Sequence, residues 1–171
     1  MGGTTEHLPQ RAGPSASTFG LLLALAVPFF LLAGCKTPKL LCFSSSGLQQ
    51  LTITSSTESN LGRPIAVDLV YVTDRKILAA VEKMKAREYF AVRTQLSRDY
   101  PKGLLVRSWE LQAGQQVVAD PVRAPCNLVG TFLFANFGGE APADNRLRLH
   151  KVRRGTLALG ADGFTWVPDK G

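Results

Sequence analysis

The segment Ile65-Ala66-Val67-Asp68-Leu69-Val70-Tyr71-Val72 alternates bulky apolar residues with smaller or polar ones over its first half. This two-residue period is typical of a β-strand, because successive side chains of a strand point to opposite faces of its sheet. Ile65, Val67, Leu69 and Tyr71 would share one face. The pattern predicts a half-buried strand over residues 65–72.

The same period recurs on both sides of this segment. Upstream, Leu51 and Ile53 alternate with Thr52 and Thr54. Downstream, strand patterns cover residues 104–111, 116–119, 128–137, 146–152, 157–159 and 164–167, and Asp162-Gly163 predicts a hairpin turn before the last of them. About seven or eight short strands in 171 residues, 45% of them apolar, predict one all-β sandwich domain over residues 48–171.

One of these segments, residues 128–137, is apolar on both faces. Alternation places Val129 and Leu133 on one face, and Phe132 and Phe134 on the other. A strand with two apolar faces must be covered on both sides. We therefore expect this strand in the interior of its sheet.

A helical element interrupts the strands at about residues 74–100. Apolar residues recur there at three- and four-residue spacing, from Ile77 through Tyr89 to Leu96, in Ala- and Lys-rich sequence. Asp74 can cap the start, and Pro101 ends the pattern. One long helix or two short ones fit, and a stripe of this kind indicates a face packed on the sheet more often than a ligand groove.

The N-terminal region has no charged side chain from Ala12 to Cys35, and residues 19–33 are densely apolar. Fifteen residues are short for a membrane span of roughly 20 but long enough for the core of a signal peptide. The run ends in Leu31-Leu32-Ala33-Gly34-Cys35. An uncleaved anchor helix or a buried core helix are the alternatives.

This ending resembles the lipobox of bacterial lipoprotein signal peptides. The resemblance implies that the Cys35 thiol receives a diacylglycerol, that residues 1–34 are removed, and that residues 35–47 tether the domain to the lipid. Lys36 replaces the Asp that commonly retains such proteins in the inner membrane. The implied location is the outer membrane, facing the periplasm, with the lipid on Cys35 as the attached group and no cofactor.

Two further cysteines would remain after lipidation, Cys42 and Cys126. An oxidising compartment such as the periplasm allows a disulfide to persist. We expect a Cys42–Cys126 disulfide, with two separate thiols as the alternative.

The chain is basic, with a formal net charge of +7, which suits contact with anionic surfaces. The densest basic run contains Arg146, Arg148, Lys151, Arg153 and Arg154. It could contact phosphates of lipid, or it could be a solvated strand face. A signal peptide argues against nucleic acid as the partner, and no aromatic residues interleave with the run as a base-stacking platform would require.

Catalytic and metal chemistry have few residues available. The chain holds two histidines: His7 would leave with the signal peptide, and His150 lies within the basic run. No Cys-x-x-Cys or His-x-x-x-His spacing is present, so a zinc site is not expected. We expect a protein that is not an enzyme and has no catalytic or metal site.

The order of these features resembles the TssJ lipoproteins of bacterial type VI secretion systems. A lipobox and tether are followed by a strand, a polar loop ending in Gly62-Arg63-Pro64, and the strand at residues 65–72. A helix with Tyr89-Phe90-Ala91 comes next, and Trp109-Glu-Leu-Gln-Ala-Gly114 follows. The chain departs from the pattern in its Lys-rich sequence after Tyr71 and in its Cys42 and Cys126 pair.

The resemblance implies a transthyretin-like β-sandwich with an added helical element, held at the outer membrane and lacking enzymatic activity. In that family the loop between the first two strands binds the periplasmic C-terminal region of the inner-membrane protein TssM, with TssL in the same complex. Carried over by position, the contact residues are Thr57, Glu58, Ser59, Asn60, Leu61 and Gly62. A polar loop on a rigid sandwich is suited to recognition, although an ordinary connecting loop is the alternative.

A second function of a different class is consistent with the basic run. A periplasmic lipoprotein could bind an anionic lipid or glycan through Arg146, Arg148 and their neighbours. Salt-sensitive ligand binding would distinguish this function from assembly of a secretion complex.

Overall fold

The computed structural model describes residues 48–119, 124–139 and 144–169. The predicted signal peptide (1–34), Cys35, the tether (35–47) and Cys42 lie outside the described residues. Their roles therefore stay predictions, and the domain described below begins at Leu48.

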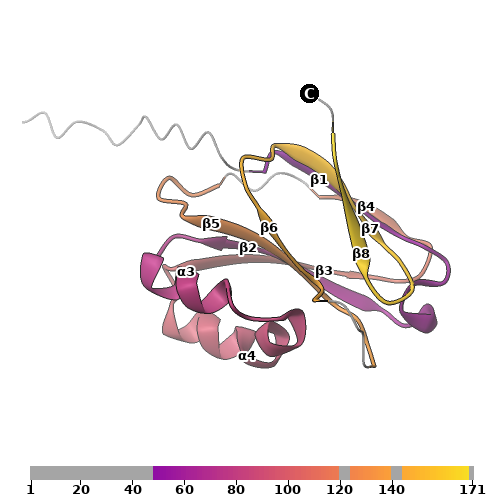
Figure 1. Cartoon of the computed structure of the whole chain (residues 1–171), viewed down its shortest axis with the longest axis horizontal. Coiled ribbons are helices and arrows are strands. Elements are labelled where there is room, and N and C mark those ends of the chain that lie inside the picture. Colours follow the sequence, from indigo (N-terminus) through magenta and orange to yellow (C-terminus); the bar gives the residue numbers. More distant parts are fainter. Residues whose placement is uncertain (1–47, 120–123, 140–143, 170–171) are drawn as a thin grey trace, which may run out of the picture. The chain divides into compact units, whose positions relative to one another are not determined.

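Eight strands form two four-stranded sheets (Figure 1). The first sheet has the order β4-β1-β7-β8, with β1 (Gln50–Ser55), β4 (Gln116–Ala119), β7 (Arg154–Leu159) and β8 (Phe164–Pro168). The second has the order β3-β2-β5-β6, with β2 (Ile65–Val72), β3 (Leu104–Leu111), β5 (Gly130–Asn136) and β6 (Arg146–Leu149). β1 and β7 are parallel, and the other neighbours are antiparallel. The predicted all-β sandwich is confirmed.

The main core lies between the two sheets. Leu51 and Ile53 of β1 and Leu157 of β7 pack there against Ile65 and Val67 of β2, and all five are almost completely buried. The alternation in β1 and β2 therefore sets which face of each sheet is turned inward. The hairpin predicted at Asp162-Gly163 joins β7 to β8 as expected, with Gly160 N donating to Gly163 O at 2.7 Å.

Two helices, α3 (Arg75–Val81) and α4 (Ala86–Asp99), cover the other face of the second sheet (Figure 1). The Asp74 side chain accepts a hydrogen bond from Lys76 N at 2.8 Å and caps α3 as predicted. The backbone N–H of Lys85 donates to the Glu88 carboxylate at 2.9 Å, which starts α4 separately. The sequence allows one long helix or two short ones, and the structure has two.

The helices bury the face of β2 that we expected to be half open. Val70 and Val72 pack with Ile77 and Val81 of α3, so β2 is buried on both faces. Asp68, on the same face, is completely buried. The expectation of a half-buried strand was wrong because the spacing within β2 does not show what covers its second face.

β5 lies in the interior of its sheet, between β2 and β6, as predicted. Leu133 faces the other sheet, and Phe132 and Phe134 face the helices. Val129 packs on the helix side rather than beside Leu133. The alternation fails there because Val129 precedes the strand, which begins at Gly130.

The sandwich has a loop end and an entry end. At the loop end, β1 and β7 finish and β2 begins, and Ser56 N donates to Leu159 O at 3.0 Å. At the entry end, β1 and β7 begin, and Gln49 N donates to Arg153 O at 2.6 Å. The six residues of β1 separate the two ends by about 20 Å.

Candidate functional site

The loop between β1 and β2 has an unusual backbone at its tip. A short 3₁₀ segment, η1 (Ser59–Gly62), contains Asn60, Leu61 and Gly62 with φ of 49°, 55° and 77°. The left-handed region is natural for glycine and tolerated by asparagine, but it costs a leucine roughly 1–2 kcal/mol. Leu61 is nevertheless 80% exposed, so contacts of its own side chain within the domain do not repay this cost.

Hydrogen bonds of Asn60 hold this conformation. Its side-chain amide donates to the carbonyl oxygen of Pro64 at 2.9 Å and to that of Arg63 at 3.3 Å. Its side-chain oxygen accepts from Gly138 N at 2.7 Å, and its backbone N–H donates to Ala161 O at 2.9 Å. One buried side chain thus connects the loop to the end of β5, while the backbone connects it to the β7–β8 hairpin.

Further bonds tie the start of the loop to its neighbours. The hydroxyl groups of Ser55 and Ser59 are hydrogen-bonded, and both residues are buried. The carbonyl oxygen of Ser56 accepts from Gly114 N, in the turn between β3 and β4, at 3.0 Å. The loop is therefore fixed on several sides, while its tip stays exposed.

The Arg63 side chain lies close to the backbone of Gly138. A Cβ added at Gly138 would lie 3.1 Å from Cζ of Arg63. The next residue, Gly139, has a φ of 82°, and its carbonyl oxygen accepts a hydrogen bond from Arg87 of α4. Gly138 thus lets the guanidinium of Arg63 approach the end of β5 closely, while a Cβ at Gly139 would be in ordinary contact with it at 3.9 Å.

The six residues predicted to contact a partner divide into two groups. Ser59 and Asn60 are buried and support the loop from inside. The exposed residues are Thr57, Glu58, Leu61 and Gly62. The supporting role of Gly138 was not predicted, because its only sign in the sequence is the Gly138-Gly139 pair, 78 residues after Asn60.

The predicted basic run also divides into two parts. Arg146 and Arg148 of β6 reach Glu82, the residue after α3: Arg146 donates to its carbonyl oxygen, and Arg148 is paired with its carboxylate. Lys151, Arg153 and Arg154 are exposed at the entry end. The five residues therefore do not form one solvated strand face.

The structure describes only one of the three cysteines. Cys126 is exposed and disulfide-bonded, while Cys35 and Cys42 lie outside the described residues. The pairing with Cys42 stays a prediction. Within residues 48–119, 124–139 and 144–169, no three His, Cys, Asp or Glu side chains are placed to hold a metal ion, and no helix is long and apolar enough to span a bilayer.

A buried polar group fixes α4 on the second sheet. Tyr89 Oη donates to Asp68 Oδ2 at 3.0 Å, and Arg93 of the same helix donates to both Asp68 oxygens at 3.2 and 3.0 Å. Burial, together with the neighbouring Asp68 carboxylate, raises the pKa of the Tyr89 phenol well above its ordinary value of 10. The phenol therefore stays protonated and serves as a hydrogen-bond donor within the fold.

Comparison with solved structures identifies what this architecture resembles. The type VI secretion lipoprotein TssJ1 from Pseudomonas aeruginosa matches with a TM-score of 0.53 at 13% identity, over 71% of this chain and 95% of that one. The chain has the TssJ lipoprotein fold. Lip from Serratia marcescens, described as a membrane-bound component of the type VI secretion system, matches with a TM-score of 0.52 at 12% identity, over 72% of this chain and 99% of that one.

A chain of a type VI membrane complex also shares the TssJ fold. It matches with a TM-score of 0.55 at 15% identity, over 71% of this chain and 98% of that one. No protein-family model matches the sequence, and no curated protein sequence does. The likeness is thus one of three-dimensional structure, between chains whose sequences have diverged widely.

Proposed function

We propose that this protein is a structural component of a type VI secretion membrane complex, anchored in the outer membrane by a lipid on Cys35. Its β1–β2 loop would bind the periplasmic C-terminal region of a TssM-like inner-membrane protein, with TssL in the same complex. The role is one of assembly, without catalysis.

The main support for this proposal is the conformation and exposure of Leu61. A large apolar side chain is held in a costly left-handed conformation and exposed on a fixed loop. Strained backbone of this kind persists at functional sites because surrounding bonds impose it. A partner that buries Leu61 would gain apolar contact without ordering the loop, which is the property of an interface anchor.

Two other observations support the proposal. The solved structures that share this fold are described as type VI secretion lipoproteins or as parts of the membrane complex. The lipobox at residues 31–35 supports attachment to a membrane through Cys35. Replacing Cys35 with serine should abolish incorporation of a labelled fatty acid, and retention of the label would refute this anchor.

The partner is tested by crosslinking bacterial envelopes that contain the full-length tagged protein and capturing it from detergent. Three versions are compared: wild type, Leu61→Asp, and Val118→Asp as a matched control. Val118 is 59% exposed on β4, toward the entry end, so it receives the same change away from the loop. Co-purifying proteins are identified by mass spectrometry.

Wild type and Val118→Asp should recover a TssM-like inner-membrane protein. Leu61→Asp should lose most of it, because truncation of an interface anchor costs 2 kcal/mol or more, about 30-fold in affinity. Equal recovery by Leu61→Asp, with an unchanged thermal midpoint, would remove the loop from the interface. Failure of the wild type to recover such a protein, once shown to be folded and lipidated, would refute the assembly role.

A further inference from the structure

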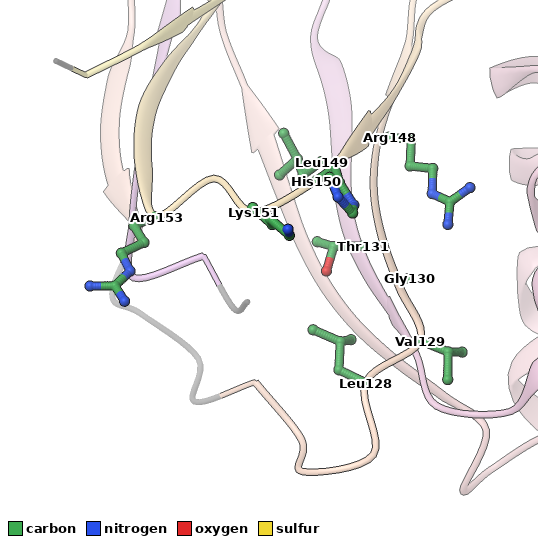
Figure 2. Close-up of a pocket in the computed structure, with 9 residues that line it drawn as sticks. All are labelled: Leu128, Val129, Gly130, Thr131, Arg148, Leu149, His150, Lys151 and Arg153. Atoms are coloured by element: carbon green, nitrogen blue, oxygen red, sulfur yellow. The ribbon is translucent and has the colours of Figure 1, made fainter. Parts of the chain in front are cut away.

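A basic pocket lies at the entry end, away from the β1–β2 loop. It has a volume of about 450 Å³ and lies between residues 128–131, where β5 begins, and residues 148–153, where β6 ends (Figure 2). Arg148 and Arg153 are on opposite sides of His150 and Lys151 in this view. Thr131 and Leu128 complete the polar and apolar parts of the wall.

The charge of this pocket is largely uncompensated. Arg148 is paired with Glu82, but Lys151 and Arg153 form no ion pair within the described part of the chain, nor does the neighbouring Arg154. The sequence from Arg146 to Ala161 contains no acidic residue. Asp169, whose backbone N–H donates to Arg154 O at 3.2 Å, is the neighbouring acidic residue, and it forms no ion pair with these cations in the described part of the chain. Exposed cations that outnumber the nearby carboxylates favour a negatively charged ligand.

The turn that carries these cations has a constrained backbone. Lys151 has a φ of 54°, in the left-handed region, and is exposed. The carbonyl oxygen of Arg153 accepts hydrogen bonds from Gln49 N at 2.6 Å and Gln50 N at 3.1 Å. The basic turn is therefore fixed directly to the residues through which the chain enters the sandwich.

This position relates the pocket to the anchor. Leu48 follows Cys35 by 13 residues, which span at most about 45 Å when fully extended. A chain lipidated at Cys35 would thus hold the entry end within about 45 Å of the membrane surface, so that its cations can reach the lipid headgroups. The β1–β2 loop lies at the other end of β1, so along the chain it is farther from the Cys35 anchor than the entry end is.

We propose that the basic pocket binds the anionic headgroups of the membrane that holds the lipid anchor. This inference rests on the proposed lipidation of Cys35 but not on the partner of the loop. Lys151, Arg153 and Arg154 supply charge to lipid phosphates, and the pocket between residues 128 and 151 receives a headgroup. Docking by this end turns the loop end toward the periplasm.

The test uses the full lipidated protein reconstituted in vesicles, without any partner protein. Vesicles contain either phosphatidylcholine alone or phosphatidylcholine with one third phosphatidylglycerol. A brief pulse of an acetylating reagent is followed by mass spectrometry of each lysine. Lys85 is the internal control, because it is exposed and precedes Arg87, whose guanidinium contacts Gly139 near the loop end.

In anionic vesicles the acetylation rate of Lys151 should fall at least about fivefold, while that of Lys85 stays the same. High salt should restore Lys151 acetylation, because it screens contacts between the surface and the headgroups. Arg153→Gln should weaken the protection about fivefold, the effect expected for one cation near an anionic bilayer. Arg107→Gln removes one exposed cation from β3 instead and should leave the protection unchanged.

Equal acetylation of Lys151 in the two kinds of vesicle would overturn the proposal. Protection by inorganic phosphate in phosphatidylcholine vesicles would also overturn it, in favour of a soluble phosphate ligand. Because no partner is present, these outcomes are independent of whether Leu61 binds a TssM-like protein. Loss of fatty-acid labelling at Cys35 is measured on the same sample and identifies failure of the anchor itself.

Discussion

The side-chain oxygen of Asn60 accepts a hydrogen bond from Gly138 N at 2.7 Å, which joins the β1–β2 loop to the end of β5. The same side chain donates to the carbonyl oxygens of Arg63 and Pro64. Asn60 therefore couples the conformation of the loop tip to the second sheet. We expect the left-handed backbone at Leu61 to depend on this coupling, because Asn60 directly precedes Leu61 and shares its left-handed conformation.

Asn60→Ala should lower the free energy of unfolding by about 2–4 kcal/mol. The change removes the side-chain partner of the partly buried backbone groups of Arg63, Pro64 and Gly138, at about 1–3 kcal/mol, and places alanine in the left-handed region. Urea denaturation measures it. Asn127→Ala, at an exposed asparagine, should change the free energy by less than about 0.5 kcal/mol. A loss below about 1 kcal/mol for Asn60→Ala would show that the loop is held without it.

Leu61→Gly should weaken partner binding while leaving the fold as stable as the wild type or up to about 1 kcal/mol more stable. Glycine removes the left-handed strain and an exposed side chain, at the cost of its own backbone entropy. Partner affinity and the thermal midpoint are measured on the same variant: the affinity should fall, and the midpoint should stay the same or rise. Val118→Gly, in β4, should instead lose about 1 kcal/mol. Clear destabilisation by Leu61→Gly would mean that the leucine stabilises the fold.

Gly155→Ala should lower the free energy of unfolding by about 1–3 kcal/mol or more. A Cβ at this position would lie 2.3 Å from Cζ2 of Trp166 and 2.9 Å from the Val167 backbone oxygen, so overpacking cannot be relieved by one side chain. Tryptophan fluorescence reports both unfolding and displacement of Trp166. Gly160→Ala, whose Cβ meets a backbone oxygen at 3.3 Å, should cost less. Equal effects would contradict this packing argument.

Much of the fold could be predicted because its strands carry their own pattern. The apolar period of Leu51, Ile53 and Val67 places them in the core between the sheets, and Asp74 marks the start of α3. The sequence could not show which strands pair, because pairing joins residues far apart, such as Gln50 and Arg154 in parallel β1 and β7. Nor could it show that helices cover Asp68, which reads as a surface residue within β2.

The candidate site was predictable in position but not in construction. The resemblance to TssJ lipoproteins placed it on the loop that ends in Gly62-Arg63-Pro64, between β1 and β2, and Leu61 of that loop is exposed. Ser59 and Asn60 look like surface residues in the sequence because their buried partners come from distant segments. The basic run likewise gave no sign that Glu82 would pair with Arg148 and leave Lys151 unpaired within the described residues.

The buried Tyr89–Asp68 hydrogen bond should make the fold sensitive to alkaline pH. Burial and Asp68 raise the pKa of Tyr89 in the folded state, and burial also raises the pKa of Tyr71, so the unfolded chain loses these protons first. The free energy of unfolding should therefore be constant with respect to these groups below about pH 10 and fall above it, by up to about 1.4 kcal/mol per pH unit for each tyrosine.

Tyr89→Phe should flatten this fall while costing about 1–2 kcal/mol at neutral pH through the lost hydrogen bond. Tyr71→Phe/Tyr89→Phe should flatten it further, and urea denaturation between pH 8 and about 11 measures all three slopes. An unchanged slope in Tyr89→Phe would show that the unfolded chain does not give up its proton before the folded one.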